Sequence, residues 1–256
     1  MLYSGTSMAP TPSFPDIALA AALAYLLGSI PAAYLCGRVN GIDIFKVGSG
    51  QAGSTNVWRE VSRKAAAVTF FTDFAKGLAA LLVARALGLH SEFLLIPAFA
   101  TVLAHWNSPW THFKGGDGIA PFTGVGIGFA PHLIAIPYAL ILVITLAWNK
   151  RLNHPALWGA VIGYIAILGM AFVPATRTTP VEALGFTGLG ALIVLHSVVF
   201  RRRRRRKVLE LLAAELAAEV AQDANEILDQ PGKALASESA APADDGDASP
   251  FSGSRA

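Results

Sequence analysis

Two glycine-rich stretches contain the residue types best suited to bind a phosphate group. The first, residues 48–56, alternates glycines with hydroxyl and amide side chains, and Arg59 follows it closely. The second, residues 113–118, has three glycines in its last four positions, and Lys114 precedes them. Glycine-rich backbone can turn several N–H groups toward one point, and a neighbouring cation adds mobile positive charge. Both stretches are therefore predicted to hold anions, and the surrounding elements must position them.

Those surrounding elements are typical of a membrane protein. The chain has 256 residues, of which 54% are hydrophobic and 14% are charged, and its mean hydropathy is +0.50. Most of it cannot form a water-facing fold, so we predict a polytopic membrane protein. Cys36 is the single cysteine, which excludes a disulfide framework and a cysteine-based metal site.

Apolar runs along the chain predict an all-α fold of seven transmembrane helices. They cover residues 17–35, 65–89, 93–106, 119–148 (two helices, divided at residues 128–131), 157–173 and 183–200. In the first run Pro31 lacks a backbone N–H, and small residues beside it let a neighbouring helix approach. Residues 1–15 contain no Lys or Arg, so the basic region of a cleaved signal peptide is missing and the first run is expected to be a retained span.

Charged side chains recur within the second apolar run. Thr69, Asp73 and Lys76 follow one another at helical spacing and share one face. A charge within a span costs about 2.5–3.5 kcal/mol on insertion scales unless it faces protein or water. We therefore expect this face to point into the bundle. There Asp73 and Lys76 either form a structural ion pair or have a catalytic role, and the sequence leaves both open. His105 also has two interpretations, a site residue or an interfacial residue beside Trp106.

The distribution of cations predicts the orientation of the chain in its membrane. Lys and Arg near the ends of spans stay on the cytoplasmic side. If the N-terminus is outside, only Arg85 and Arg177 fall in outside connections, whereas the cations of the other connections lie inside. Both glycine-rich loops and the C-terminus are then cytoplasmic.

The expected domain organisation has four parts. Residues 1–15 form an extracytoplasmic segment and residues 16–207 form the membrane domain, which ends in a block of seven cations, residues 201–207. That block is typical of an anchor on anionic lipid, worth about 1 kcal/mol per charge near the surface, and not of nucleic-acid binding. Residues 208–230 mix Leu, Val and Ile with Ala and Glu, which predicts a cytoplasmic amphipathic helix, and residues 231–256 have too little apolar surface to fold.

A series of short motifs runs in order through residues 28–118. They are Gly28-Ser29-Ile30-Pro31, Gly41-Ile42-Asp43-Ile44, Gly48-Ser49-Gly50, Gly53, Thr55-Asn56-Val57, Arg59, Asp73, Lys76-Gly77, His105 and Phe113-Lys114-Gly115-Gly116 with Gly118. The series resembles the bacterial acyl-phosphate:glycerol-3-phosphate acyltransferases, the PlsY family, over about residues 28–124. The predicted span count agrees with the seven spans of that family.

The resemblance implies transfer of a fatty acyl group from acyl phosphate to the 1-hydroxyl of glycerol 3-phosphate, which yields lysophosphatidic acid for phospholipid synthesis. It implies Ser49, Arg59 and Lys114 as catalytic residues, with the two cations as phosphate ligands. Substrate or phosphate contacts are implied for Gly48, Gly50, Gly53, Thr55, Asn56, Gly115, Gly116 and Gly118, and further candidates are Ser29, Asp73, Lys76, His105 and Asp117. No metal or other cofactor is expected. The expected partners are membrane lipids, acyl phosphate and glycerol 3-phosphate, and the protein is expected to be a monomer.

The chain departs from the family pattern at several positions. Asp117 replaces a lysine of the second loop, Phe45 replaces an arginine, Gln51 replaces an asparagine, and arginines 202–206 occupy the place of a third motif that contains histidine and asparagine. A carboxylate near a phosphate opposes the binding of a dianion. Two interpretations are therefore open. The chain is either an acyltransferase in which arginines 201–206 replace the third motif, or a degenerate paralogue that binds or regulates without turnover.

Overall fold

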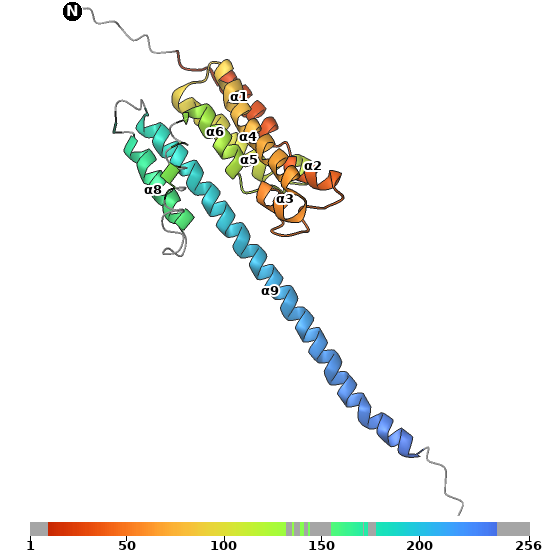
Figure 1. Cartoon of the computed structure of the whole chain (residues 1–256). Helices are drawn as coiled ribbons and strands as arrows, with labels where there is room; N and C mark the ends of the chain where they lie inside the picture. The colour runs from red at the N-terminus through yellow and green to blue at the C-terminus, as the bar shows by residue number, and fades with distance from the viewer. Residues whose placement is uncertain are drawn as a thin grey trace, which may run out of the picture. The chain divides into compact units, whose positions relative to one another are not determined.

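The computed structural model describes residues 10–131, 135, 139–140, 143, 155–170, 172–173 and 178–239, and these residues form helices and connecting loops without a β-strand (Figure 1). The predicted all-α class is confirmed for this part of the chain. Two compact units are present, residues 1–200 and residues 201–256. The residues considered below as a site all belong to the first unit.

The helices follow the apolar runs of the sequence closely. They are α1 (Phe14–Gly28), α2 (Ala32–Val39), α3 (Ser54–Glu60), α4 (Arg63–Ala86), the 3₁₀ turn η1 (Ser91–Leu94), α5 (Leu95–Trp106), the 3₁₀ turn η2 (Pro109–Thr111), α6 (Ile119–Phe129), α8 (Pro155–Met170) and α9 (Pro180–Ser239). Ser13 caps α1 by accepting from the N–H of Asp16, and Ser62 caps α4 by accepting from the N–H of Ala65.

Three helical stretches among the described residues are long and apolar enough to cross a membrane. They are Phe14–Val39, Arg63–Ala86 and Pro180–Asn225, and Ile119–Phe129 is a shorter apolar helix. The second half of the predicted run 119–148 lies largely outside the described residues, so the count of seven spans stays a prediction. The first predicted span is two helices, because the chain leaves helical geometry at residues 29–31 before Ala32 begins α2.

The last helix is longer than the sequence predicts. We expected a span that ends at Phe200, a separate helix over residues 208–230 and a disordered tail from residue 231, but α9 continues to Ser239. Residues 233–239 are rich in Ala, Leu, Lys, Ser and Glu, which are compatible with a helix, and Pro231 and Gly232 at the predicted boundary do not end the element. Residues 240–256 of the predicted tail lie outside the described residues.

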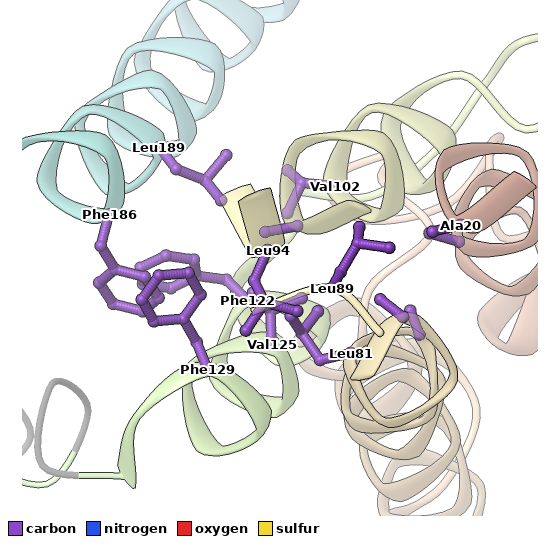
Figure 2. Packing of buried hydrophobic residues seen from close by; sticks show 14 of the residues in the cluster. Ala20, Leu81, Leu89, Leu94, Val102, Phe122, Val125, Phe129, Phe186 and Leu189 are labelled. Carbon is purple, nitrogen blue, oxygen red and sulfur yellow. The ribbon is translucent and has the colours of Figure 1, made fainter. Parts of the chain in front are cut away.

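Helix α4 is the centre of the first unit, since it packs against α1, α2, α3, α5 and α6. Its Leu81 is fully buried beside Val125 of α6 (Figure 2). Phe122 and Phe129, also on α6, lie against the ring of Phe186 on α9, with ring centroids 4.6 Å and 5.9 Å apart. Aromatic and aliphatic side chains thus fix α6 between α4 and the first turns of α9.

Glycines permit the closest helix contacts of this unit. A methyl group on Gly77 of α4 would collide with the carbonyl group of Pro121, and one on Gly124 of α6 would collide with the carbonyl oxygen of Phe74. In the same way Gly28 of α1 lies against the backbone of Thr101 on α5. Small residues at such crossings let the backbones themselves approach, as is common between helices in membranes.

We predict that Gly124→Ala destabilises the protein, because the added methyl group forces α4 and α6 apart, at a cost of about 1–3 kcal/mol for an overpacked site. Gly188→Ala is the matched control, since a methyl group on that helical glycine meets nothing within 4 Å. Alanine is otherwise the better helix former, so the control is expected to leave the unfolding midpoint unchanged or to raise it. Equal shifts of the midpoint in detergent would contradict this account of the crossing.

Candidate functional site

The first glycine-rich loop is held in shape by the side chain of Asn56. Its Oδ1 accepts a hydrogen bond from the N–H of Ser49 at 2.9 Å. Its Nδ2 donates to the carbonyl oxygens of Ile44 at 3.1 Å, Val47 at 3.3 Å and Gln51 at 3.1 Å. Asn56 is only 3% exposed. The amide is therefore occupied by the loop backbone, and its role in the structure is to position the loop.

The two glycine-rich loops meet backbone to backbone. The N–H of Ala52 donates to the carbonyl oxygen of Gly115 at 3.1 Å. A methyl group on Gly116 would collide with the carbonyl oxygen of Ala52, and one on Gly115 would collide with the carbonyl groups that end α5 at His105 and Trp106. Glycine at these positions is thus required for close approach. The sequence predicts that both loops lie on one face of the membrane, and in the structure the two loops are in direct contact.

The second loop is fixed at both of its ends. At one end the hydroxyl group of Thr111 donates to the carbonyl oxygen of Lys114. At the other end Nε1 of Trp106 donates to the carbonyl oxygen of Asp117 at 2.9 Å. The carboxylate of Asp117 accepts from the N–H of Ile119 at 3.1 Å, where α6 begins. A negative charge stabilises a helix N-terminus, so the residue that departs from the family pattern has a structural role here.

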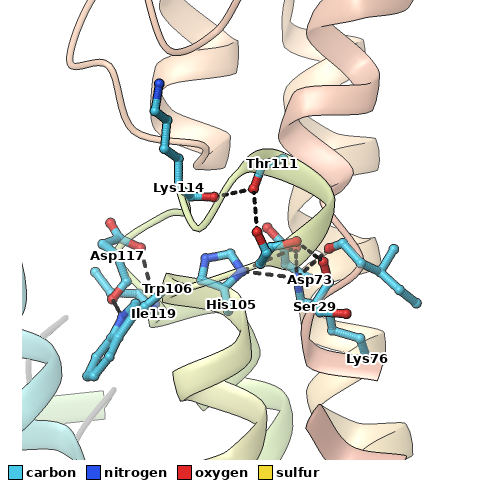
Figure 3. Close-up of polar contacts among 11 residues, drawn as sticks. Ser29, Asp73, Lys76, His105, Trp106, Thr111, Lys114, Asp117 and Ile119 are labelled. Carbon is cyan, nitrogen blue, oxygen red and sulfur yellow. Dashed lines mark hydrogen bonds and ion pairs between the residues drawn. The ribbon is translucent and has the colours of Figure 1, made fainter. Parts of the chain in front are cut away.

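A buried charged cluster lies below the second loop (Figure 3). Nζ of Lys76 is 2.7 Å from Oδ1 of Asp73, and both side chains are 3% exposed. The same Nζ donates to the carbonyl oxygen of Ile30 at 2.8 Å and lies 3.0 Å from Nδ1 of His105. The prediction that Asp73 and Lys76 face the bundle is confirmed. His105 is 6% exposed and lies inside the protein, so the interfacial interpretation is wrong.

A small pocket connects this cluster with the second loop. Its lining combines Lys114 and the backbone of Gly115 and Gly116 with Asp73 and His105. The break between α1 and α2 closes the pocket, and its remaining lining residues are Gly28, Ser29, Ile30, Pro31, Ala32, Ala33, Ala52 and Ser108. Lys114, two glycines and the buried His105 thus line one space, and the ammonium end of Lys114 points away from His105 (Figure 3).

Comparison with known proteins agrees with this geometry. The family described as "Glycerol-3-phosphate acyltransferase" matches residues 18–212. The chain belongs to this family. A relative of the same name from Agrobacterium fabrum is 37% identical over 77% of this chain and 89% of its own length. Another, from Synechococcus sp., is 35% identical over 75% of this chain and 90% of its own length.

Solved structures of the family also resemble the chain. One of them is a crystal structure of PlsY, an integral membrane glycerol 3-phosphate acyltransferase, in its glycerol 3-phosphate form. It matches with a TM-score of 0.59 and 30% sequence identity, and the match covers 78% of this chain and 93% of the PlsY chain. The lysophosphatidic acid form matches with a TM-score of 0.58 at 29% identity, over 76% and 91% of the two chains. The chain is accordingly a membrane protein.

The predicted site residues of this acyltransferase family member divide into two groups. Those that line the pocket are Ser29, Asp73, His105, Lys114, Gly115 and Gly116, and those outside its lining are Gly48, Ser49, Gly50, Gly53, Thr55, Asn56, Arg59, Lys76, Asp117 and Gly118. Ser49 and Arg59 are exposed. Nζ of Lys114 lies 5.9 Å from the ring centroid of Phe45, so the segment before the first loop supplies an aromatic face to the cation.

Sequence reasoning missed Ser108, which joins two parts of the site. Its hydroxyl group donates to the carbonyl oxygen of Ser29 at 2.6 Å, and the hydroxyl group of Ser29 accepts from Nε1 of Trp110 at 3.0 Å. These bonds hold the segment before the second loop against the α1–α2 break. The only available signal was the Ser-Pro pair at residues 108–109, which is typical of any turn.

A second and wider groove of about 370 Å³ lies between α3 and α4. Thr55 and Trp58 of α3 face Phe70, Phe71 and Arg63 of α4 across it. Trp58 is 58% exposed and Phe71 is 66% exposed, so large aromatic surface is left open beside a cation. Such a groove suits a molecule with an apolar chain and an anionic group.

We predict that Asn56→Ala lowers the free energy of unfolding by about 1–3 kcal/mol, because it leaves buried loop carbonyl groups without donors. Asn40→Ala is the control, since Asn40 is exposed and its amide makes a single bond, to the carbonyl oxygen of Cys36 at 2.7 Å. Unfolding midpoints in the same detergent measure the difference. A control variant as unstable as Asn56→Ala would show that the loop does not depend on Asn56.

Proposed function

We propose that the protein transfers a fatty acyl group from acyl phosphate to the 1-hydroxyl of glycerol 3-phosphate, with lysophosphatidic acid and inorganic phosphate as products. The observation that carries the proposal is the contact between the two glycine-rich loops, beside a pocket that Lys114, Gly115 and Gly116 line together with the buried His105. Membership of the family and its two PlsY neighbours, one in the glycerol 3-phosphate form and one in the lysophosphatidic acid form, supports it.

For this reaction the protein must position the two substrates and neutralise the charge of their phosphate groups. An acyl phosphate is a mixed anhydride with a good leaving group. The hydroxyl group of the acceptor attacks the acyl carbon, the bond from that carbon to the phosphate oxygen breaks, and the released phosphate takes the electron pair and the hydroxyl proton. Both substrates carry phosphate, and Lys114 and Arg59 are the cations proposed to hold these groups, with Ser49 beside them as the third catalytic residue. Held phosphates and a fixed approach angle then supply much of the rate.

The acyl chain of the donor has a proposed place in the groove between α3 and α4. Ala66, Ala67, Phe70 and Phe71 give the groove an apolar wall on α4, and Thr55 and Arg63 line it as well. A chain bound there would lie beside α3, which follows directly from the first glycine-rich loop. This arrangement supports a site in which a lipid donor and a water-soluble acceptor meet at the membrane surface.

The orientation proposed for this reaction puts both loops on the cytoplasmic side of the bacterial inner membrane, with the N-terminus outside and the protein acting as a monomer. Acceptor and donor are then supplied from the cytoplasm and from the inner leaflet. Arginines 202–206, which replace the family's third motif, are proposed to add positive charge near that surface.

The alternative function is a degenerate paralogue that binds phosphate or lipid without turnover. It rests on Asp117, which places a negative charge where the family usually has a lysine. Because the carboxylate of Asp117 accepts from the N–H of Ile119, it has a reason to be present that does not require a loss of activity. We therefore favour the acyltransferase.

We predict that the purified protein makes lysophosphatidic acid and that Lys114→Ala lowers kcat/KM for glycerol 3-phosphate by roughly 10- to 100-fold, the value of about 1.5–3 kcal/mol for a hydrogen bond to a charged group. Lys46→Ala is the control, because the Lys46 side chain is 83% exposed and pairs only loosely with Asp43 at 3.7 Å. Wild-type protein that forms no product from acyl phosphate and glycerol 3-phosphate would leave the alternative function.

A second prediction separates the charge of Asp117 from its capping bond. Asp117→Asn keeps an oxygen that can accept from Ile119 but removes the negative charge, whereas Asp117→Lys loses the oxygen and adds a positive charge. Both substitutions are expected to lower KM for glycerol 3-phosphate, and only Asp117→Lys should lower the unfolding midpoint, by the equivalent of about 1 kcal/mol for a lost cap. Unchanged KM in both variants would place Asp117 outside the electrostatic field of the site.

A further inference from the structure

The ammonium group of Lys76 has three hydrogens and three neighbours that can accept them. Nζ lies 2.7 Å from Oδ1 of Asp73, 2.8 Å from the carbonyl oxygen of Ile30 and 3.0 Å from Nδ1 of His105. The contact with Asp73 is an ion pair, so Lys76 acts as an ammonium group, which can donate but not accept. Two hydrogens go to the two oxygens, and the third therefore points at Nδ1 of His105, which must accept it.

A neutral histidine that accepts at Nδ1 carries its proton on Nε2. In His105 that nitrogen lies against the second glycine-rich loop, since a methyl group on Gly116 would collide with it. Figure 3 shows the ring below the loop that carries Lys114 and Asp117. Nε2 has no hydrogen-bond partner in the part of the chain that the structure describes, although His105 is only 6% exposed. His105 lines the small pocket, so this N–H can donate to a ligand that is bound there.

The space in front of this donor is small. The pocket that His105 lines with Lys114 has room of about 10 Å³, which is close to the least that holds a single water molecule. A whole phosphate group does not fit there, but one of its oxygens or a carbonyl oxygen does. The geometry thus offers a fixed N–H to a single oxygen atom.

We propose that Lys76 fixes His105 as the neutral Nε2–H tautomer, and that this N–H donates a hydrogen bond to one substrate oxygen, either a phosphate oxygen or the acyl carbonyl oxygen. The inference rests on the proposed acyl transfer and adds a residue to its site. His105 then stabilises negative charge and does not act as the base that takes the proton of the acceptor hydroxyl. Lys76 is a positioning residue, because it reaches the substrate only through His105.

Two substitutions of His105 test the role of its two nitrogens separately. In His105→Gln the amide nitrogen can reach the position of Nε2, whereas in His105→Asn the shorter amide reaches only the position of Nδ1. We expect His105→Gln to keep kcat/KM within about tenfold of wild type and His105→Asn to lower it roughly 100-fold or more, as for the loss of one donor to a developing oxyanion. Equal losses, or a greater loss in His105→Gln, would overturn the proposal.

The same variants identify the oxygen. A higher KM for glycerol 3-phosphate in His105→Asn, with kcat unchanged, assigns the donor to the acceptor's phosphate. A lower kcat with both KM values unchanged assigns it to the carbonyl oxygen, whose charge grows in the transition state.

The tautomer can be measured without turnover. In wild-type protein labelled with nitrogen-15 histidine, the His105 signals are those lost in His105→Gln. At neutral pH we expect a protonated Nε2, an unprotonated Nδ1, and a change of the Nε2 signal when glycerol 3-phosphate is added. A proton on Nδ1, or on both nitrogens, would overturn the inference even if the enzyme is active. The expected spectrum in a protein that makes no lysophosphatidic acid would refute the proposed function and leave the tautomer assignment intact.

Discussion

The buried ion pair between Asp73 and Lys76 is the interaction on which the site depends. Two charges inside an apolar helix cost free energy unless each finds a partner, and here the ammonium group also reaches Ile30 and His105. Ile30 lies where α1 ends and α2 has not begun, and its carbonyl oxygen accepts from Lys76 and from the N–H of Ala32 at 3.2 Å. Irregular backbone inside a membrane protein is tolerated only where other groups complete its hydrogen bonds. One lysine thus ties the α1–α2 break and α5 to α4.

The glycines around this cluster serve close approach as much as anion binding. Gly115 and Gly116 lie directly on the backbone of α5 and of the first loop, where no side chain fits. Both glycines also line the pocket beside His105. The pattern that predicts phosphate binding from the sequence is therefore also a packing pattern, and the two roles cannot be separated by substituting glycine alone.

The sequence predicted those features that depend on local periodicity and on charge. The apolar runs gave the positions of the helices, and the spacing of Asp73 and Lys76 gave the face that points inward. It could not predict side-chain hydrogen bonds that depend on the exact geometry of a loop, such as those of Asn56 to its own loop and that of Asp117 to the N–H of Ile119. The length of α9 was missed for another reason, since Pro231-Gly232 is a sequence signal for the end of a helix and α9 continues through it.

Two departures from the family pattern bear on the second loop. Phe45 stands where an arginine is usual, and its ring faces the ammonium group of Lys114. Asp117 stands where a lysine is usual, and its carboxylate caps α6. A cation near an exposed aromatic face gains about 0.5–1 kcal/mol, which is enough to bias the position of a flexible side chain but not to withhold it from a phosphate. Where the family pattern has further cations, this chain keeps Lys114 and orients it, so the affinity of the second loop for a phosphate depends on that one side chain and on the backbone N–H groups beside it.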